Sequence, residues 1–122
     1  MRILKMRETL PDRRCSWTKD TVIQGHSIEL GFGEYEDGRL GEIWINMSKL
    51  GTFARTIMGK LARTISISLQ CGATPEMVVH SLREEEPDEK IDGSTSVELG
   101  DEVADWIAAQ IEAHYCTPPV VE

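Results

Sequence analysis

The chain has 122 residues, of which 40% are hydrophobic and 28% charged, and its formal net charge is -8 at pH 7. This length is typical of one domain with a single core. The apolar runs are far shorter than the roughly 20 residues that cross a bilayer, and residues 1 to 7 lack the apolar run of a signal peptide. We therefore expect a cytoplasmic protein that does not enter a membrane.

The net charge is unevenly distributed. Residues 84 to 102 contain nine acidic residues and one lysine, which accounts for the whole excess, whereas residues 1 to 19 contain six basic and two acidic residues. We predict a basic N-terminal arm over residues 1–16 and an acidic loop over residues 85–98, and direct nucleic-acid binding is not expected. Two interpretations stay open: both segments are simply solvated, or the arm docks on an acidic surface of this chain or of a partner.

The cysteines and histidines indicate neither a disulfide framework nor a metal site. The cysteine number is odd and there is no CxxC pair, which agrees with a reducing compartment. No cysteine or histidine shares a zinc-like spacing with another, and we expect no metal and no other cofactor. A Cys–His nucleophile pair requires a spatial proximity that the sequence does not reveal. The roles of the cysteines stay open; they are Cys15, Cys71 and Cys116.

Three strands are predicted in the first half of the chain. Residues 17–24 are rich in Thr, Val and Ile, and Gly25 and His26 form a plausible two-residue turn. Residues 27–34 and 42–47 alternate between apolar and polar, which is typical of half-buried strands. Asp37 and Gly38 between them favour a tight hairpin turn. These segments predict a three-stranded antiparallel meander.

A long amphipathic helix is predicted over residues 52–71. Its apolar stripe repeats every four residues at Ile57, Leu61, Ile65 and Leu69, and we expect this stripe to cover the sheet. The candidates for its N-cap are Ser48 and Thr52, and the glycine that ends it is Gly72. A further glycine inside the helix, Gly59, suggests close approach by another backbone.

Two shorter helices follow. One is predicted to begin at Pro75 with Thr74 as N-cap and to end near Glu84. The other begins near Leu99 or Asp101 and ends before residues 117–122, which form a C-terminal tail; a mobile loop is expected over residues 87–96. The fold class is therefore α+β, a three-stranded antiparallel meander packed on one long helix and two shorter helices, with a single domain over residues 17–116.

Two groups of residues are candidates for binding. The glycine-bearing entry into the long helix could hold an anion, such as a phosphate, on free amide groups, although an ordinary helix start explains the same pattern; these residues are Lys49, Gly51, Thr52 and Arg55. The candidates for contact with a partner are Arg13, Arg14 and Trp44. Trp44 lies on the polar face of its strand, where it either packs against the arm or contacts a partner.

Residues 7 to 82 resemble the TSCPD domain, the C-terminal domain of adenosylcobalamin-dependent ribonucleotide reductases. The resemblance is carried by residues 7–14, by Gly25-His26, by residues 33–45 with the run Glu34-Tyr-Glu-Asp-Gly-Arg-Leu-Gly-Glu-Ile43, and by residues 65–72 with Thr74-Pro75. Residues 95–99 read Thr-Ser-Val-Glu-Leu where smaller members carry Thr-Ser-Cys-Pro-Asp, so the role of that cysteine does not transfer. A lone Cys116 likewise cannot supply the C-terminal dithiol of the reductases.

The resemblance implies an accessory, non-catalytic interaction module linked to nucleotide metabolism, because the catalytic barrel of the reductases is far larger than this chain. Its partner would be a reductase or a second copy of the chain. Free-standing modules of this kind are also known from phage-type genomes. Two alternatives stay open: a protein that binds a nucleotide or phosphate at Gly51, Thr52 and Arg55, and an acidic regulatory adaptor that acts through residues 84–102.

Overall fold

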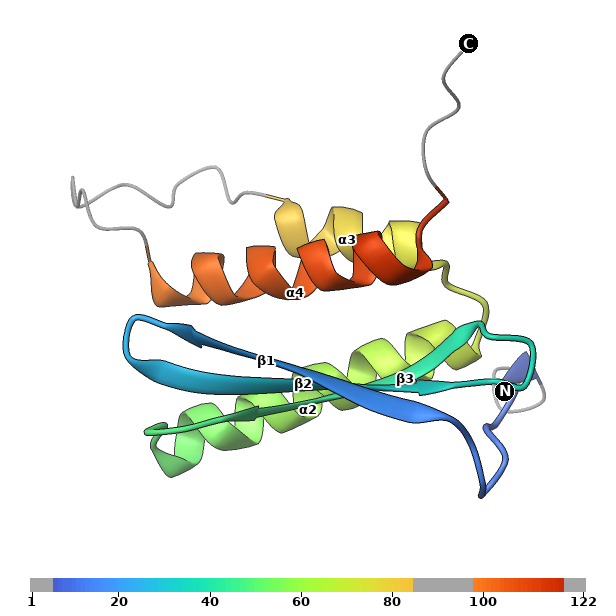
Figure 1. Cartoon of the computed structure of the whole chain (residues 1–122), viewed down its shortest axis with the longest axis horizontal. Helices are drawn as coiled ribbons and strands as arrows, with labels where there is room; N and C mark the ends of the chain where they lie inside the picture. The colour runs from blue at the N-terminus through green and yellow to red at the C-terminus, as the bar shows by residue number, and fades with distance from the viewer. Residues whose placement is uncertain (1–5, 85–97, 118–122) are drawn as a thin grey trace, which may run out of the picture. The chain divides into compact units, whose positions relative to one another are not determined.

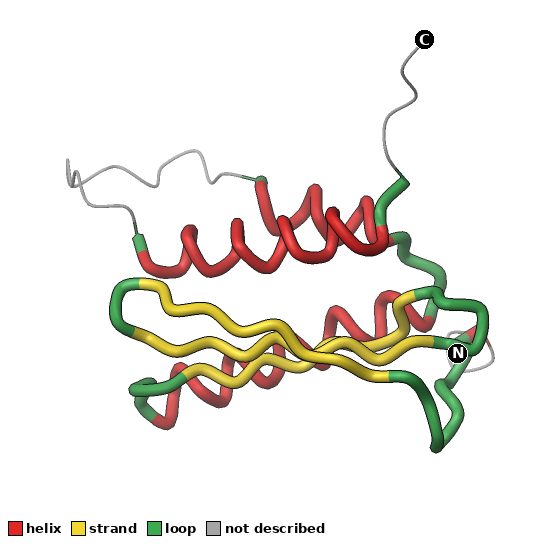
Figure 2. Tube along the Cα trace, in the orientation of Figure 1, coloured by secondary structure: helices red, strands yellow, loops and turns green. Residues whose placement is uncertain are grey.

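The computed structural model describes residues 6–84 and 98–117. Three strands are followed by three helices, as Figures 1 and 2 show. The chain divides into two compact units, residues 1–74 with the sheet and the long helix, and residues 75–122 with the other two helices. The predicted α+β class, with a three-stranded antiparallel sheet and three helices, is confirmed. The single domain over residues 17–116 stays a prediction.

The sheet is a meander of β1 (Ser16–Ile23), β2 (His26–Glu34) and β3 (Leu40–Met47) in the order β1-β2-β3. The first turn is formed by Gln24 and Gly25, both with positive φ, and not by Gly25 and His26 as predicted. The second turn contains Gly38 at φ 89, as the Asp-Gly pair predicted. Because the loops are short, each strand lies beside its sequence neighbour.

The two faces of the sheet differ sharply. Leu30 lies opposite Ile45 and Phe32 opposite Ile43, and all four side chains are buried. The ring of Trp17 stacks on Phe32 with ring centroids 4.4 Å apart. The alternating polar residues of β2 and β3 lie on the other face, as the period of two predicts.

The long helix, α2 (Thr52–Gln70), buries only part of its predicted stripe. Ile65 and Leu69 are buried, whereas Ile57 is 49% and Leu61 37% exposed. The prediction that all four cover the sheet is therefore wrong for the first two. The buried set follows the i, i+3, i+4 spacing of one helix face and consists of Ala62, Ile65, Ser66, Leu69 and Gln70.

The ends of α2 were predicted with mixed success. The N-cap is Gly51, without a side-chain cap, so the expected capping by Ser48 or Thr52 is wrong. Ser48 instead accepts a hydrogen bond from the Ser27 amide on its hydroxyl, which ties it to the first hairpin. Gly72 after the helix has φ 108, the left-handed conformation predicted for it.

The glycine inside α2 does not mark a close approach. A Cβ at Gly59 would meet no atom within 4 Å among the described residues, so the expected neighbouring backbone is absent there. A Cβ at Gly31 of β2 would instead lie 1.9 Å from the ring of Trp44. A close approach is found instead inside the sheet, where the indole of Trp44 on β3 lies over Gly31 of β2.

The second unit consists of α3 (Pro75–Arg83), which packs on α4 (Leu99–Tyr115). Both helices were predicted with nearly these boundaries. Arg83 of α3 forms an ion pair with Glu112 of α4 at 3.0 Å, and Thr117 donates its amide to Glu76 at 3.1 Å. That hydrogen bond lowers the pKa of the Glu76 carboxyl.

Two predicted segments lie outside the described residues: nearly all of the acidic loop, and the C-terminal tail from residue 118. Among the helices that the structure describes, none has the length and hydropathy of a membrane span.

Candidate functional site

The N-terminal arm is held at the C-terminal end of α2. The amide of Glu8 donates to the backbone oxygen of Gln70 at 2.8 Å, and Arg7 donates Nε to the side-chain oxygen of Gln70 at 2.7 Å. The side chain of Leu10 approaches Gly41 so closely that a Cβ there would lie 2.7 Å from it. Residues 7–10 of the arm are therefore part of the folded unit, because backbone, polar and apolar contacts all hold them.

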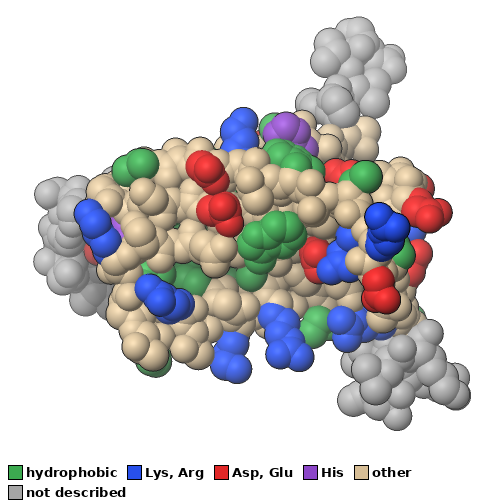
Figure 3. Space-filling view, turned by 60° about the horizontal axis from the view of Figure 1, so that its bottom comes forward, with side chains coloured by type: hydrophobic (Ala, Val, Ile, Leu, Met, Phe, Trp, Pro, Cys, Tyr) green, Lys and Arg blue, Asp and Glu red, His purple; other side chains and the backbone are tan. Residues whose placement is uncertain are grey.

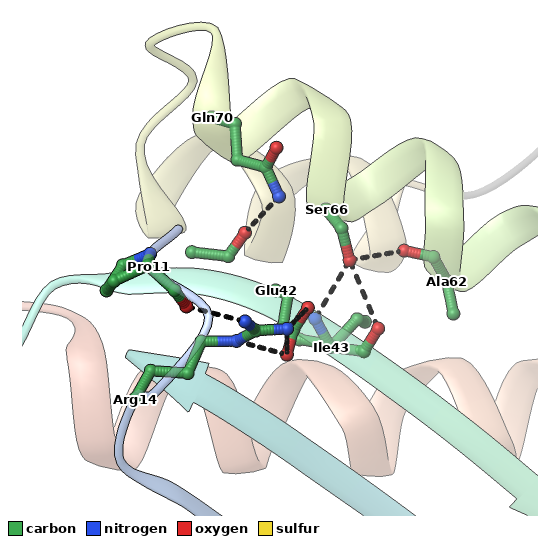
Figure 4. A network of polar contacts seen from close by, with 8 residues as sticks. Pro11, Arg14, Glu42, Ile43, Ala62, Ser66 and Gln70 are labelled. Atoms are coloured by element: carbon green, nitrogen blue, oxygen red, sulfur yellow. Dashed lines mark hydrogen bonds and ion pairs between the residues drawn. The ribbon is translucent and has the colours of Figure 1, made fainter. Parts of the chain in front are cut away.

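One base of the arm, Arg14, contacts a single carboxylate of this chain, and docking of the arm on a wider acidic surface stays a prediction. Arg14 donates two hydrogen bonds to the carboxylate of Glu42, at 2.9 and 3.0 Å, and a third to the carbonyl of Pro11 at 2.7 Å (Figure 4). The hydrogen bond to Glu42 raises the pKa of Arg14. Two parallel bonds of this kind fix the geometry of both side chains.

A second contact of the arm involves the β2–β3 turn. The hydroxyl of Tyr35 donates to the carbonyl of Glu8, and Arg39 forms ion pairs with Glu8 at 3.0 Å and Asp37 at 2.7 Å. The guanidinium of Arg39 lies over the Tyr35 ring, 4.5 Å from its centroid. Burial raises the pKa of the Tyr35 phenol, and hydrogen bonds from Arg39 lower the pKa of Asp37.

The outer edge of β3 is covered by polar side chains of α2 (Figure 4). Ser66 accepts from the Ile43 amide at 2.9 Å, and its oxygen lies within hydrogen-bond distance of the Ile43 and Ala62 carbonyls. Gln70 donates to the Gly41 carbonyl at 2.9 Å. These groups would otherwise be open to a further strand, so α2 blocks pairing along this edge.

The predicted partner residues have different surroundings. Arg14 is engaged by Glu42, whereas Arg13 is exposed. Trp44 is half-buried over Gly31, so packing within the sheet accounts for its position.

The predicted ligand residues are only partly brought to one place. Arg55 lines an open cavity of about 840 Å³ beside the first hairpin, together with Ser48, Leu50 and Met58. Asp20 and Glu29 line the same cavity, and Lys49, Gly51 and Thr52 do not. Lys49 is exposed and has φ 62. The cavity therefore carries charges of both signs, and Arg55 is the one cation among the described residues that line it.

One surface feature was not foreseen. Phe53 is 80% exposed and lies one turn before Ile57, which lies one turn before Leu61. We call these three residues the α2 stripe. A four-residue spacing predicts that apolar side chains share one face of the helix, and here it places these three together on the surface.

The three cysteines are free; Cys15 and Cys71 belong to the first unit and Cys116 to the second. Burial raises the pKa of the Cys116 thiol, and Glu76 and Glu112 nearby act in the same direction. This thiol is therefore less nucleophilic at neutral pH than an exposed one. The described residues contain no group of three or more His, Cys, Asp and Glu side chains placed to hold a metal ion.

Comparison with known proteins gives one family. The TSCPD domain model matches residues 3–115. A vitamin B12-dependent ribonucleotide reductase of Bradyrhizobium diazoefficiens is 33% identical over 115 residues, which is 93% of this chain and 9% of the relative. The reductase of Agrobacterium fabrum matches with the same identity and coverage, and that of Rhodopirellula baltica is 41% identical over 76 residues, 62% of this chain and 7% of the relative.

No solved structure matches the chain significantly. The chain spans about 9% of the length of the first two relatives, so it corresponds to one small part of them. Since the family model covers nearly the whole chain, including the sheet, the β3 edge and the arm contacts described above, the chain belongs to the TSCPD domain family.

Proposed function

We propose that this chain is a non-catalytic accessory module of the cytoplasm that binds a ribonucleotide reductase or another protein of nucleotide metabolism. The observation that carries the proposal is the match itself: 93% of the chain corresponds to 9% of a vitamin B12-dependent reductase. A segment of that size inside a large enzyme has neighbours within the enzyme, and a chain related to that segment carries surfaces that correspond to those facing them.

The surface of the first unit supports a binding role. The arm is held by Gln70 and Glu42, and the β3 edge is covered, so the sheet presents no open edge there for non-specific pairing. The exposed apolar side chains of α2 are a part of this unit suited to specific contact, because large exposed apolar groups in register mark interaction surfaces.

Binding to a purified vitamin B12-dependent reductase that lacks its own matching segment tests this proposal. We expect the tagged chain to form a complex that elutes together in size-exclusion chromatography. Absence of a complex with that reductase and with other proteins of nucleotide metabolism would contradict a binding role. Ribonucleotide reduction by the isolated chain supplied with adenosylcobalamin would contradict a non-catalytic one.

A second candidate function is binding of a small anionic molecule, such as a nucleotide, and the observation that favours it is Arg55 in the open cavity of the first unit. Asp20 and Glu29 in the same cavity weaken the attraction for phosphate, which places this function second. A nucleotide at a hundred times its dissociation constant stabilises a protein by about 2.7 kcal/mol. We expect such a shift to disappear in Arg55→Ala and to persist in Lys60→Ala; no shift with any nucleotide would exclude this function.

A further inference from the structure

The α2 stripe is an ordered apolar surface. Phe53, Ile57 and Leu61 are 80%, 49% and 37% exposed and follow one another at single-turn intervals. Eight residues of α-helix rise about 12 Å, so the three side chains form a ridge of that length. Single exposed apolar residues are common on protein surfaces, but a row in register is the pattern by which helices contact partners.

All charged residues in the sequence around the stripe are basic. No Asp or Glu occurs between Ile43 and Pro75, whereas four cations do. Lys60 follows Ile57 by three residues, which places it beside the stripe. Arg63 follows Lys60 by three, so it is a neighbour of Lys60 and lies further round the helix from Leu61. Figure 3 shows Lys and Arg side chains along the lower margin of the molecule with apolar side chains nearby.

These cations are not neutralised by the described part of the chain. Within residues 6–84 and 98–117, Arg14, Arg39 and Arg83 each form an ion pair with a carboxylate, and Lys60 and Arg63 form none. The arginines that stabilise the fold are thus distinct from the cations beside the stripe. A partner with carboxylates at this flank would gain their attraction without displacing an internal ion pair.

We infer that the α2 stripe and its basic flank form a docking site for an acidic amphipathic segment of a protein partner. This inference rests on the proposed function and specifies the chemistry of the partner. The segment carries apolar side chains at helical spacing, which cover Phe53, Ile57 and Leu61, and Asp or Glu beside them, which face Lys60 and Arg63. Apolar burial provides the affinity, and the charges fix orientation and speed the encounter.

Other occupants fit the surface less well. A second copy that placed its own stripe on this one would bring basic flank against basic flank, since a two-fold interface pairs the same patch with itself. An anionic membrane attracts basic helices, but the widest apolar face of α2, with Ile65 and Leu69, is already buried in the folded unit. Nucleic acid would pair with the cations and leave the apolar ridge uncovered.

The test uses a labelled synthetic peptide of about 18 residues, five helical turns, with Leu along one face and Glu on the remainder. We expect it to bind the full chain in fluorescence anisotropy, more weakly as the salt concentration rises from about 50 to 500 mM. The double variant Ile57→Ser/Leu61→Ser and the double variant Lys60→Glu/Arg63→Glu should each weaken binding by about tenfold or more.

The control is Met77→Ser, which removes an exposed apolar side chain from α3 in the second unit; at 60% its exposure lies between the values for Phe53 and Ile57. It should bind the peptide as the wild type does. Circular dichroism melting of all variants checks that the fold is retained, as expected for exposed positions.

Four results would overturn the inference: no peptide binding, equal binding by the stripe variants, stripe-dependent binding to phosphatidylserine vesicles in place of the peptide, or stripe-dependent dimerisation in sedimentation. The proposed function fails separately. If Ile57→Ser/Leu61→Ser still binds the truncated reductase, the docking inference is wrong and the accessory function stands. If the wild type binds the peptide but binds no protein of nucleotide metabolism, the proposed function is wrong and the docking inference stands.

Discussion

The two halves of α2 carry the same apolar repeat and have opposite surroundings. In the C-terminal half, Ile65 and Leu69 are buried, and Ser66 and Gln70 bond the edge of β3. In the N-terminal half, Ile57 and Phe53 face solvent. The comparison teaches that amphipathic spacing defines a face of a helix, whereas burial depends on what the rest of the chain places against that face.

The polar residues explain why the C-terminal half is the anchored one. The β3 edge presents the amide and carbonyl of Ile43 and the carbonyl of Gly41, and Ser66 and Gln70 lie at the helix positions that reach them. Gln70 also receives Arg7 and Glu8 from the arm. Three segments of the chain therefore meet at this end of the helix.

The largest expected effect comes from truncating the same side chain in each half. Ile65→Ala should lower the free energy of unfolding by about 2–5 kcal/mol, because it removes buried methyl groups and leaves a cavity. Ile57→Ala should change it by no more than about 0.5 kcal/mol. Urea denaturation of both variants measures the difference. Equal losses of unfolding free energy in the two variants would mean that the N-terminal half of α2 is also packed against other residues.

The next effect concerns the β3 edge. Ser66→Ala should cost about 1–3 kcal/mol, because the buried amide of Ile43 loses its side-chain acceptor. The control is Ser68→Ala, whose hydroxyl donates only to the Thr64 carbonyl one turn back on α2. That variant should lie within about 0.5 kcal/mol of the wild type in the same denaturation experiment. Similar costs for both would argue against edge coverage by Ser66.

A glycine substitution examines the free space beside α2. Gly59→Ala should raise the stability by about 1 kcal/mol, since alanine favours the helix and its Cβ meets no atom within 4 Å in the described residues. Gly31→Ala should instead lower it by about 1–3 kcal/mol, because its Cβ would collide with Trp44. Thermal melting compares the two. A destabilised Gly59→Ala protein would reveal a close neighbour on this side of the helix.

The smallest expected effect is a raised pKa of Tyr35, whose hydroxyl contacts the arm. Because burial raises the pKa of Tyr35, its phenolate should form above the ordinary value of about 10. The hydrogen bond to Glu8 is present at lower pH and is lost as the pH rises through this raised pKa, which loosens the arm. The pKa of Tyr35 is measured from phenolate absorbance in a Tyr115→Phe variant, in which Tyr35 is the one remaining tyrosine. A midpoint at or below 10 would contradict the buried contact.

Much of the fold follows from local patterns. Alternation in residues 27–34 and 42–47 predicted β2 and β3, the Asp37-Gly38 pair predicted their turn, and Gly72 predicted the end of α2. The resemblance to the TSCPD domain, carried by runs such as residues 34–43, was confirmed by the family match. These features depend on backbone conformation and on side-chain periodicity over a few residues, which the sequence displays directly.

Long-range packing decided the rest. The sequence does not show that Ser66 and Gln70 meet the edge of β3, that Trp44 covers Gly31, or that Glu8 of the arm bonds Gln70. For the same reason it does not show that Phe53, Ile57 and Leu61 stay on the surface. By itself the sequence determined which helix face is apolar; the tertiary structure decided which part of that face is buried, because burial requires a second surface that is close in space and distant along the chain.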